Sequence, residues 1–128
     1  MKSSQLNALI AGHLTGKSLS GLLVDEVSSY ANLSEKRGAT IPLRFVEDED
    51  VVINQVGIKR LLQETLIGHL TNIDLAYICD CLTLGDRVEF NTEGLKTLVF
   101  EIADPEINGG YKSNAELQSL INNIEDLM

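Results

Sequence analysis

The stretch VINQVGIKRLLQETLIGHLTNIDLAYICDCLTLG, residues 52–85, carries apolar side chains at helical spacing almost throughout. In its first half, large aliphatic residues recur every four positions, at Ile58, Leu62, Leu66 and Leu70. Residues four apart lie on the same side of an α-helix, so this spacing predicts an amphipathic helix over roughly residues 52–70. The stretch therefore indicates a helical fold.

The second half of the stretch predicts another helix, which starts near Thr71 and Asn72. Its apolar side chains include Leu75, Ile78, Cys79 and Leu82. Gly85 follows the last of them in the C′ position, where glycine is favoured because it tolerates a positive φ. Two consecutive helices are therefore expected between residues 52 and 85.

Two further helices are expected before this stretch. Apolar residues between positions 6 and 14 predict a first short helix, with Ser3 or Ser4 as its N-cap. A second run of apolar residues at helical spacing extends from Leu23 to Ala31 and predicts another helix. Asp25 and Glu26 lie in its early turn, where negative side chains interact favourably with the positive end of the helix dipole. Both helices are short and amphipathic.

Two more helices are expected after residue 85. Asn91 or Thr92 caps a fifth helix, and Pro105 stops it because proline disfavours helical geometry in the residue before it. A sixth helix begins with the capping box Ser113 and Glu116, in which each side chain binds the other residue's backbone N–H. Its apolar residues are Leu117, Leu120, Ile121 and Ile124.

Six short helices with brief connections predict a mainly α, single-domain bundle over residues 1–128. At most one small β-hairpin is expected beside it. Residues 41–45 alternate between apolar and polar side chains, although Pro42 restricts them to an edge strand. Val88 and Phe90 alternate in the same way, so residues 88–90 are the expected partner.

The chain has 128 residues, 19 of them acidic and 10 basic, with a formal charge of −9. Partners such as DNA, RNA or an anionic membrane require clustered Lys and Arg, so this charge argues against them. The N-terminal residues lack the apolar core of a secretory signal. Cys79 and Cys81 diverge around a helix and are expected to be buried thiols. Both features predict a cytoplasmic location.

No catalytic residue stands out. His13 and His69 have no Cys or His at metal-ligand spacing, and the nucleophile motif Gly-x-Ser-x-Gly is absent. No carboxylate pair can be singled out among the 19 acids as a general acid and base. The expectation is a protein with no enzymatic activity, no metal and no cofactor.

An alternative function is a calcium-responsive helix–loop–helix module over residues 104–116. The sequence Asp-Pro-Glu-Ile-Asn-Gly at residues 104–109 matches the first six positions of a calcium loop. The twelfth position should be a bidentate Glu, yet it is Ala115, and Glu116 comes one residue late. Glu116 is also required by the capping box. A simple connection between two helices is the competing interpretation.

The charge is unevenly distributed along the chain. Residues 1–73 hold 8 acids and 7 bases, whereas residues 74–128 hold 11 acids and 3 bases. Half of the acids in the first part lie in the run Glu47 to Asp50. This asymmetry describes either an ordinary solvated surface or a surface shaped to meet a basic partner.

Three segments resemble small acidic bacterial immunity proteins, which are encoded beside polymorphic or contact-dependent growth-inhibition toxins. The segments are DLAYICDCLTL at residues 74–84, VEF at 88–90 and FEIADPEING at 100–109. In those proteins a phrase like D-L-x-Y-I-x-D-x-L is followed by an acidic x-F-x step and then D-P-E-I-N-G. Residues 26–31 also resemble their upstream helix. The match covers about half of the chain.

The resemblance implies a cytoplasmic inhibitor that binds the toxin domain of one cognate effector, as a monomer or weak homodimer. Such toxins are frequently nucleases, whose substrate-binding surfaces are basic, and an acidic surface would complement them. The residues expected to contact the toxin are Glu47, Asp48, Glu49, Asp50, Asp80, Glu89, Glu93, Asp104 and Glu106.

Overall fold

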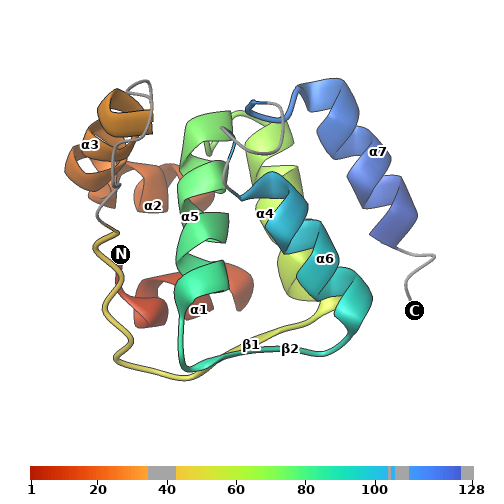
Figure 1. Ribbon diagram of the computed structural model, residues 1–128, viewed down its shortest axis with the longest axis horizontal. Helices are drawn as coiled ribbons and strands as arrows, with labels where there is room; N and C mark the ends of the chain where they lie inside the picture. Colours follow the sequence, from red (N-terminus) through yellow and green to blue (C-terminus); the bar gives the residue numbers. More distant parts are fainter. Residues whose placement is uncertain (35–42, 104, 106–109, 125–128) are drawn as a thin grey trace.

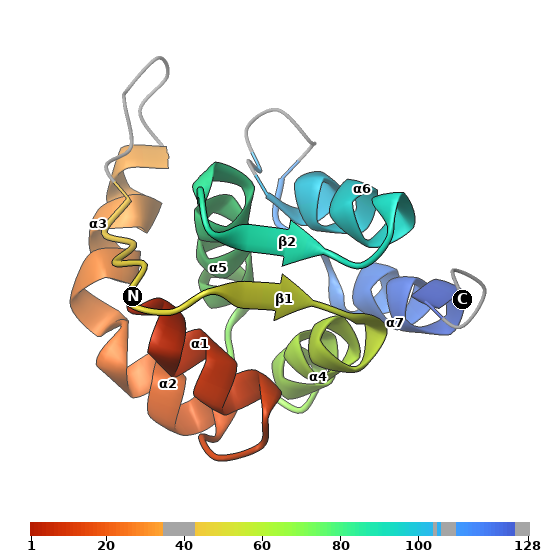
Figure 2. The same cartoon turned by 90° about the horizontal axis from the view of Figure 1, so that it is seen from below.

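Two short strands pair at one end of the molecule, β1 (Val51–Ile53) and β2 (Val88–Phe90) (Figures 1 and 2). They run parallel, with Val51 opposite Val88. Parallel strands cannot be joined by a tight turn, because the chain must return to the same starting end. Two helices, α4 (Gln55–Leu66) and α5 (Asn72–Leu84), provide this crossover.

The computed structural model describes residues 1–34, 43–103, 105 and 110–124. In this part of the chain the expected class is confirmed, since helices dominate and the β structure is one small pair of strands. The helices are α1 (Ser3–Ile10), α2 (Gly16–Leu22), α3 (Val24–Ser34), α4 (Gln55–Leu66), α5 (Asn72–Leu84), α6 (Glu93–Ile102) and α7 (Asn114–Ile124).

The expected hairpin partner of residues 88–90 is wrong. These residues pair with β1, whereas Val46 forms a single bridge with Lys2, and residues 41 and 42 lie outside the described part. Strand β1 consists of three apolar residues in a row, of which the first and last are buried and the middle one is exposed. Such a run shows no alternation in the sequence, so the pattern assigned it to the following helix.

Helix α5 lies at the centre of the bundle and is buried on nearly all sides (Figure 1). It packs against α3, α4 and α6, while α4 also contacts α1 and α7. A helix that is apolar all round belongs inside a core rather than at a surface. The buried residues of α5 are Asp74, Leu75, Ala76, Tyr77, Ile78, Cys79, Cys81 and Leu82.

Local capping signals set several helix ends. Thr92 caps α6, where its side chain accepts the Leu95 N–H at 3.2 Å. The capping box before α7 is confirmed, because the Glu116 N–H binds the Ser113 hydroxyl at 3.2 Å and the Ser113 N–H binds the Glu116 carboxylate at 3.1 Å. These contacts span three residues and depend on local sequence alone.

Other helix boundaries differ from expectation. The apolar run from Leu23 to Ala31 lies in α3 apart from Leu23, which is the C-cap of a separate preceding helix, α2, whose N-cap is Thr15. Helix α4 is shorter than residues 52–70, since its start is taken by β1 and Asn54 caps it. Ser3 and Ser4 lie in the first turn of α1, after the N-cap.

A glycine is required at position 85 because a side chain would clash with its neighbours, not because of the backbone conformation. It is the C-cap of α5 with φ −71° and ψ 136°, a conformation that any residue adopts, so its assignment to a left-handed C′ position is wrong. A Cβ atom at this position would lie 2.6 Å from Val88 Cγ2 and 2.7 Å from Glu47 Oε1. The absence of a side chain therefore allows three segments to meet.

Both cysteines are free and buried, as expected. Burial raises the pKa of the Cys79 thiol far above its usual range, and it raises the pKa of Cys81 to about 12. Neither thiol is therefore a nucleophile at neutral pH. Among the described helices, none has the length and apolar character needed to span a membrane.

Gly85→Ala is expected to destabilise the fold by about 1–3 kcal/mol, because the new methyl group overpacks the contact between the α5 end, β2 and Glu47. Gly21→Ala is the matched control. A Cβ atom there meets nothing within 4 Å, and alanine within α2 is expected to add about 0.5–1 kcal/mol. Urea unfolding of both variants measures the difference, and equal midpoints would contradict the expectation.

Candidate partner-binding surface

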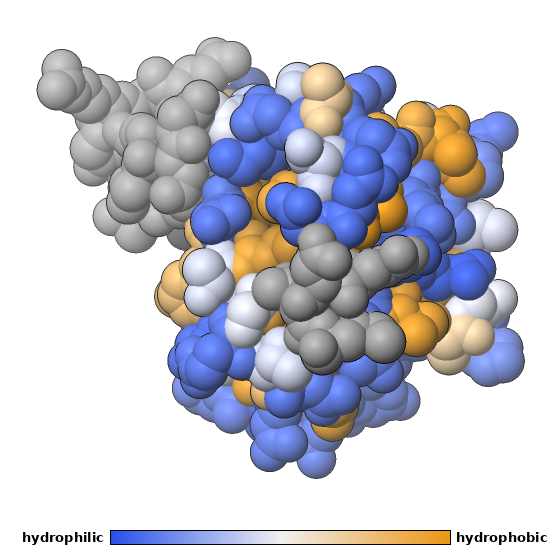
Figure 3. Space-filling view, turned by 90° about the vertical axis from the view of Figure 1, so that its right-hand side faces the viewer, coloured by the Kyte–Doolittle hydropathy of each residue, from blue (hydrophilic) through white to orange (hydrophobic). Residues whose placement is uncertain are grey.

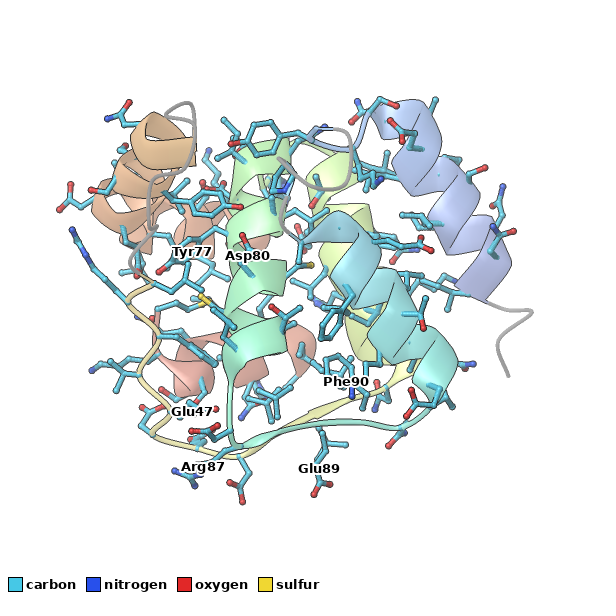
Figure 4. The ribbon with its side chains drawn as sticks, viewed as in Figure 1. Glu47, Tyr77, Asp80, Arg87, Glu89 and Phe90 are labelled. Atoms are coloured by element: carbon cyan, nitrogen blue, oxygen red, sulfur yellow. The ribbon has the colours of Figure 1, made fainter. Side chains whose placement is uncertain are left out.

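Most of the acids expected to bind a partner meet at the end of the molecule that carries the strands. Residues 47–50 form the turn that enters β1, Glu89 lies within β2, and Glu93 begins α6. Because the two strands pair in parallel, residues 47–50 lie beside the turn before β2 and Glu89 lies opposite Val52, whereas Glu93 follows the far end of β2. Figure 4 shows Glu47 and, just below it, Arg87 at the lower left of the molecule, with Glu89 farther right along the same lower edge.

We call this surface the acidic end and define it by Glu47, Asp48, Glu49, Asp50, Asp86, Glu89 and Glu93. The segments 47–50 and 86–93 that form it contain these seven acids and one base, Arg87. Asp86 was not among the expected site residues. In the sequence, Asp86 lies just before the alternating segment 88–90, which was the only indication that it belongs to this surface. Strand pairing is what brings it beside residues 47–50.

Asp48 ties the acidic end to the first turn of α1. Its carboxylate accepts the Ser4 hydroxyl at 2.6 Å, the Ser4 N–H at 2.9 Å and the Ser3 hydroxyl at 2.9 Å. The Ser4 hydrogen bonds, with a smaller effect from Ser3, lower the pKa of Asp48 from 3.8 to about 2. A negative charge there also faces the positive end of the helix dipole.

Arg87 and Glu47 join the turns that precede the two strands. Arg87 Nε lies 2.6 Å from Asp50 Oδ1, and Arg87 Nη1 donates to the Glu47 carbonyl at 2.7 Å. In return, the Glu47 carboxylate accepts the backbone N–H groups of Asp86 and Arg87, at 3.2 and 2.9 Å. An exposed ion pair adds little stability, so the main effect of these contacts is to fix the shape of the surface.

Glu89 and Glu93 face solvent. Glu89 is exposed in the middle of β2 and lies opposite Val52, whose side chain is 51% exposed. Glu93 is exposed in the first turn of α6. Figure 4 shows Glu89 pointing away from the body of the protein, whereas the neighbouring Phe90 points into it. The alternation of β2 therefore directs one carboxylate outward.

Asp80 does not join the acidic end. It lies on α5, half-buried, and its carboxylate accepts the Tyr30 hydroxyl at 2.5 Å. The Tyr30 ring makes an edge-to-face contact with Tyr77, at 5.4 Å between centroids. Asp80 is therefore held within the contact between α3 and α5. The other two expected residues, Asp104 and Glu106, lie outside the described residues.

A second polar cluster, which the sequence did not indicate, lies behind the segment that leads to the acidic end. The buried Tyr77 hydroxyl donates to Glu26 at 2.6 Å and accepts the Arg44 N–H at 3.2 Å. Glu26 also binds the Met1 amino group. Burial, reinforced by Glu26, raises the pKa of Tyr77 above its usual range. The cluster fastens residue 44 to α5 and α3.

The described part of the chain contains no group of three or more His, Cys, Asp or Glu residues placed to hold a metal ion. His69 Nδ1 contacts Glu64 at 2.6 Å, and no further ligand joins them there. Most of the expected calcium loop, residues 104 and 106–109, lies outside the described residues. Glu116 is engaged in the capping box of α7.

The side of the molecule that carries α7 offers a different surface (Figure 3). Hydrophilic residues predominate on its coloured part, and apolar residues form small separate patches. Phe100 and Tyr111 are 45% and 37% exposed. Apolar residues scattered in this way are normal for a protein surface and do not by themselves indicate a binding site.

The chain matches no protein-family model, no curated protein and no solved structure.

Asp48→Asn is expected to be less stable than the unmodified protein at pH 7, because an acceptor oxygen for the α1 turn becomes a donor. The lowered pKa of Asp48 adds stability above pH about 4, and this is lost as the pH falls toward about 2. The difference between the two proteins should therefore shrink over this interval. Thermal unfolding at several pH values measures it.

Glu89→Gln is the control for this measurement, because it removes one charge from the acidic end without touching α1. Its stability should follow that of the unmodified protein more closely at every pH. An Asp48→Asn variant as stable as the unmodified protein at pH 7 would contradict the anchoring role of Asp48.

Proposed function

We propose that this chain is a bacterial immunity protein that binds and neutralises the toxin domain of a cognate effector. Toxins of this class are frequently nucleases. Inhibition is stoichiometric and involves no chemical step. The protein acts in the cytoplasm as a monomer or weak homodimer. The resemblance of residues 74–110 to immunity proteins supports this proposal, and so does the shape of the charged surface.

The acidic end is the observation that carries the proposal. Its two segments have a net charge of −6, because they contain seven acids and one base. A nuclease must present a basic cleft to the phosphates of its substrate, and an acidic surface can occupy such a cleft. Complementary charge also speeds the encounter of two proteins, which suits an inhibitor that must act before damage occurs.

The acids of this surface have different tasks in the proposal. Asp48 and Glu47 use their carboxylates for internal hydrogen bonds, so they hold the surface in shape. Glu89 and Glu93 are exposed and are the expected direct contacts with the partner. A surface that is already ordered loses less conformational entropy on binding, which favours tight association.

Co-expression with the toxin domain encoded by the neighbouring gene tests the function. The expected result is restored growth of cells that carry the toxin, together with a one-to-one complex measured by calorimetry. A catalytically inactive toxin domain serves for the calorimetry. Failure of the rescue, combined with the absence of a complex, would remove the proposal.

Reversing the exposed charges tests the role of the acidic end. Glu89→Lys combined with Glu93→Lys should lower the association rate with the toxin domain about tenfold at low salt, with a smaller effect at high salt. Asp25→Lys combined with Glu101→Lys is the matched control, since it makes the same charge change at exposed positions on α3 and α6. An equal loss in both variants would show that net charge, rather than this surface, directs binding.

A further inference from the structure

A pocket of about 290 Å³ opens beside the acidic end. It lies between the segment that precedes β1 and the last turn of α5, which run side by side in Figure 1. Its lining residues are Leu43, Phe45, Glu47, Cys81, Leu84 and Gly85. All six belong to the described residues, and one of them, Glu47, is part of the acidic end.

The walls of this pocket are apolar and polar in about equal parts, and Leu43, Phe45 and Leu84 supply apolar side chains. Leu43 and Phe45 are half-buried against the core, and Leu84 is 71% exposed at the rim. An exposed leucine beside a cavity offers apolar area that an incoming side chain can cover, at about 25 cal/mol per Å². Burial raises the pKa of the Cys81 thiol to about 12, so this side chain adds no charge to the pocket near neutral pH.

Glu47 is the charged group in the lining. Its carboxylate accepts two backbone N–H groups, from Asp86 and Arg87, whereas an ionised carboxylate has about four lone-pair sites. An apolar occupant would cover this group without pairing it, which costs free energy. An anionic occupant would be repelled by Glu47 and by the neighbouring acids at residues 48–50. A hydrogen-bond donor fits this group, and a cationic donor also neutralises its charge and makes the stronger bond.

Gly85 keeps the charged group and the apolar wall close together. A Cβ atom at Gly85 would lie 2.7 Å from Glu47 Oε1 and 3.1 Å from Phe45 Cε2. Without that atom, the carboxylate and the aromatic ring both approach the end of α5. The pocket therefore combines an apolar wall with a carboxylate, which matches a side chain that has an aliphatic stem and a cationic head.

We propose that this pocket receives one lysine or arginine side chain of the partner, with its stem against Leu43, Phe45 and Leu84 and its head paired with Glu47. The inference rests on the proposed function, because the acidic end is what turns a basic partner toward this pocket. It names the anchoring contact within that surface. Anchors of this kind, seated in a pocket at an interface, contribute much of the binding free energy.

Small cations that mimic the two side chains test the pocket on the full chain without a toxin. We would titrate N-butylguanidinium and n-butylamine, and follow the backbone amides by NMR. The expected result is saturable shifts at Leu43, Phe45, Leu84 and Gly85, with Kd values in about the millimolar range. The neutral analogue 1-butanol should bind about tenfold more weakly, and butyrate should not bind.

Two variants separate the charge from the apolar wall. Glu47→Gln should weaken binding of both cations about tenfold and affect 1-butanol much less, and the amide signals of Asp86 and Arg87, which bind Glu47, check that the surface keeps its shape. Leu84→Ala should weaken all three about threefold. Ile67→Ala is the matched control, because Ile67 is a large apolar residue that is 64% exposed after α4. It should leave all three titrations unchanged.

Several outcomes would overturn the proposal. Equal binding of 1-butanol and the cations would show that the pocket is an apolar cavity with no preference for charge. Chemical shift changes that do not saturate and spread over the acidic end would show general charge attraction without a specific pocket. These results are independent of the co-expression test. If the pocket binds the cations but the protein does not rescue cells from the toxin, the immunity function alone is removed. If Leu84→Ala and Glu47→Gln both rescue fully and bind the toxin domain with unchanged affinity, the anchor alone is removed.

Discussion

The burial of α5 on nearly all of its sides is the constraint on which the rest of the structure depends. A helix of this kind needs cover from several directions, and α3, α4 and α6 provide it. The crossover between the parallel strands has the same origin. The chain passes through α4 and the central α5 before β2 can return beside β1. The small sheet is therefore a consequence of how the core is enclosed, and it sets where the charged segments meet.

The acidic end combines two uses of the carboxylate group. Some of its acids hold the surface together: Asp48 binds the first turn of α1, while Glu47 and Asp50 bind the turn before β2. Glu89 and Glu93 extend into solvent from a strand and a helix start. A cluster of like charges repels itself, so hydrogen bonds from uncharged donors and one arginine are needed to keep it ordered. The same contacts place Glu47 in the wall of the neighbouring apolar pocket.

Sequence reasoning succeeded where the deciding interactions span a few residues. Ser113 and Glu116 form the predicted capping box, and Thr92 caps α6. It failed for β1, because three apolar residues in a row carry no alternation that marks a strand. The sequence also gives no sign that the Asp80 carboxylate binds the Tyr30 hydroxyl between two helices. The two residues lie fifty positions apart in the sequence.

By itself, the sequence determined that this protein is a mainly helical bundle with a strongly acidic composition. Helical periodicity and helix caps depend on residues close in the sequence, and net charge is a sum over side chains. These properties can therefore be predicted without knowledge of the tertiary structure. Only the tertiary structure decided that β1 and β2 are parallel, and that Asp86 and Glu89 lie beside residues 47–50. It also decided that Gly85 is needed for space, since the atoms a side chain would meet come from two other segments. These features depend on which residues far apart in the sequence pack together, and that packing is set by the burial of the whole core.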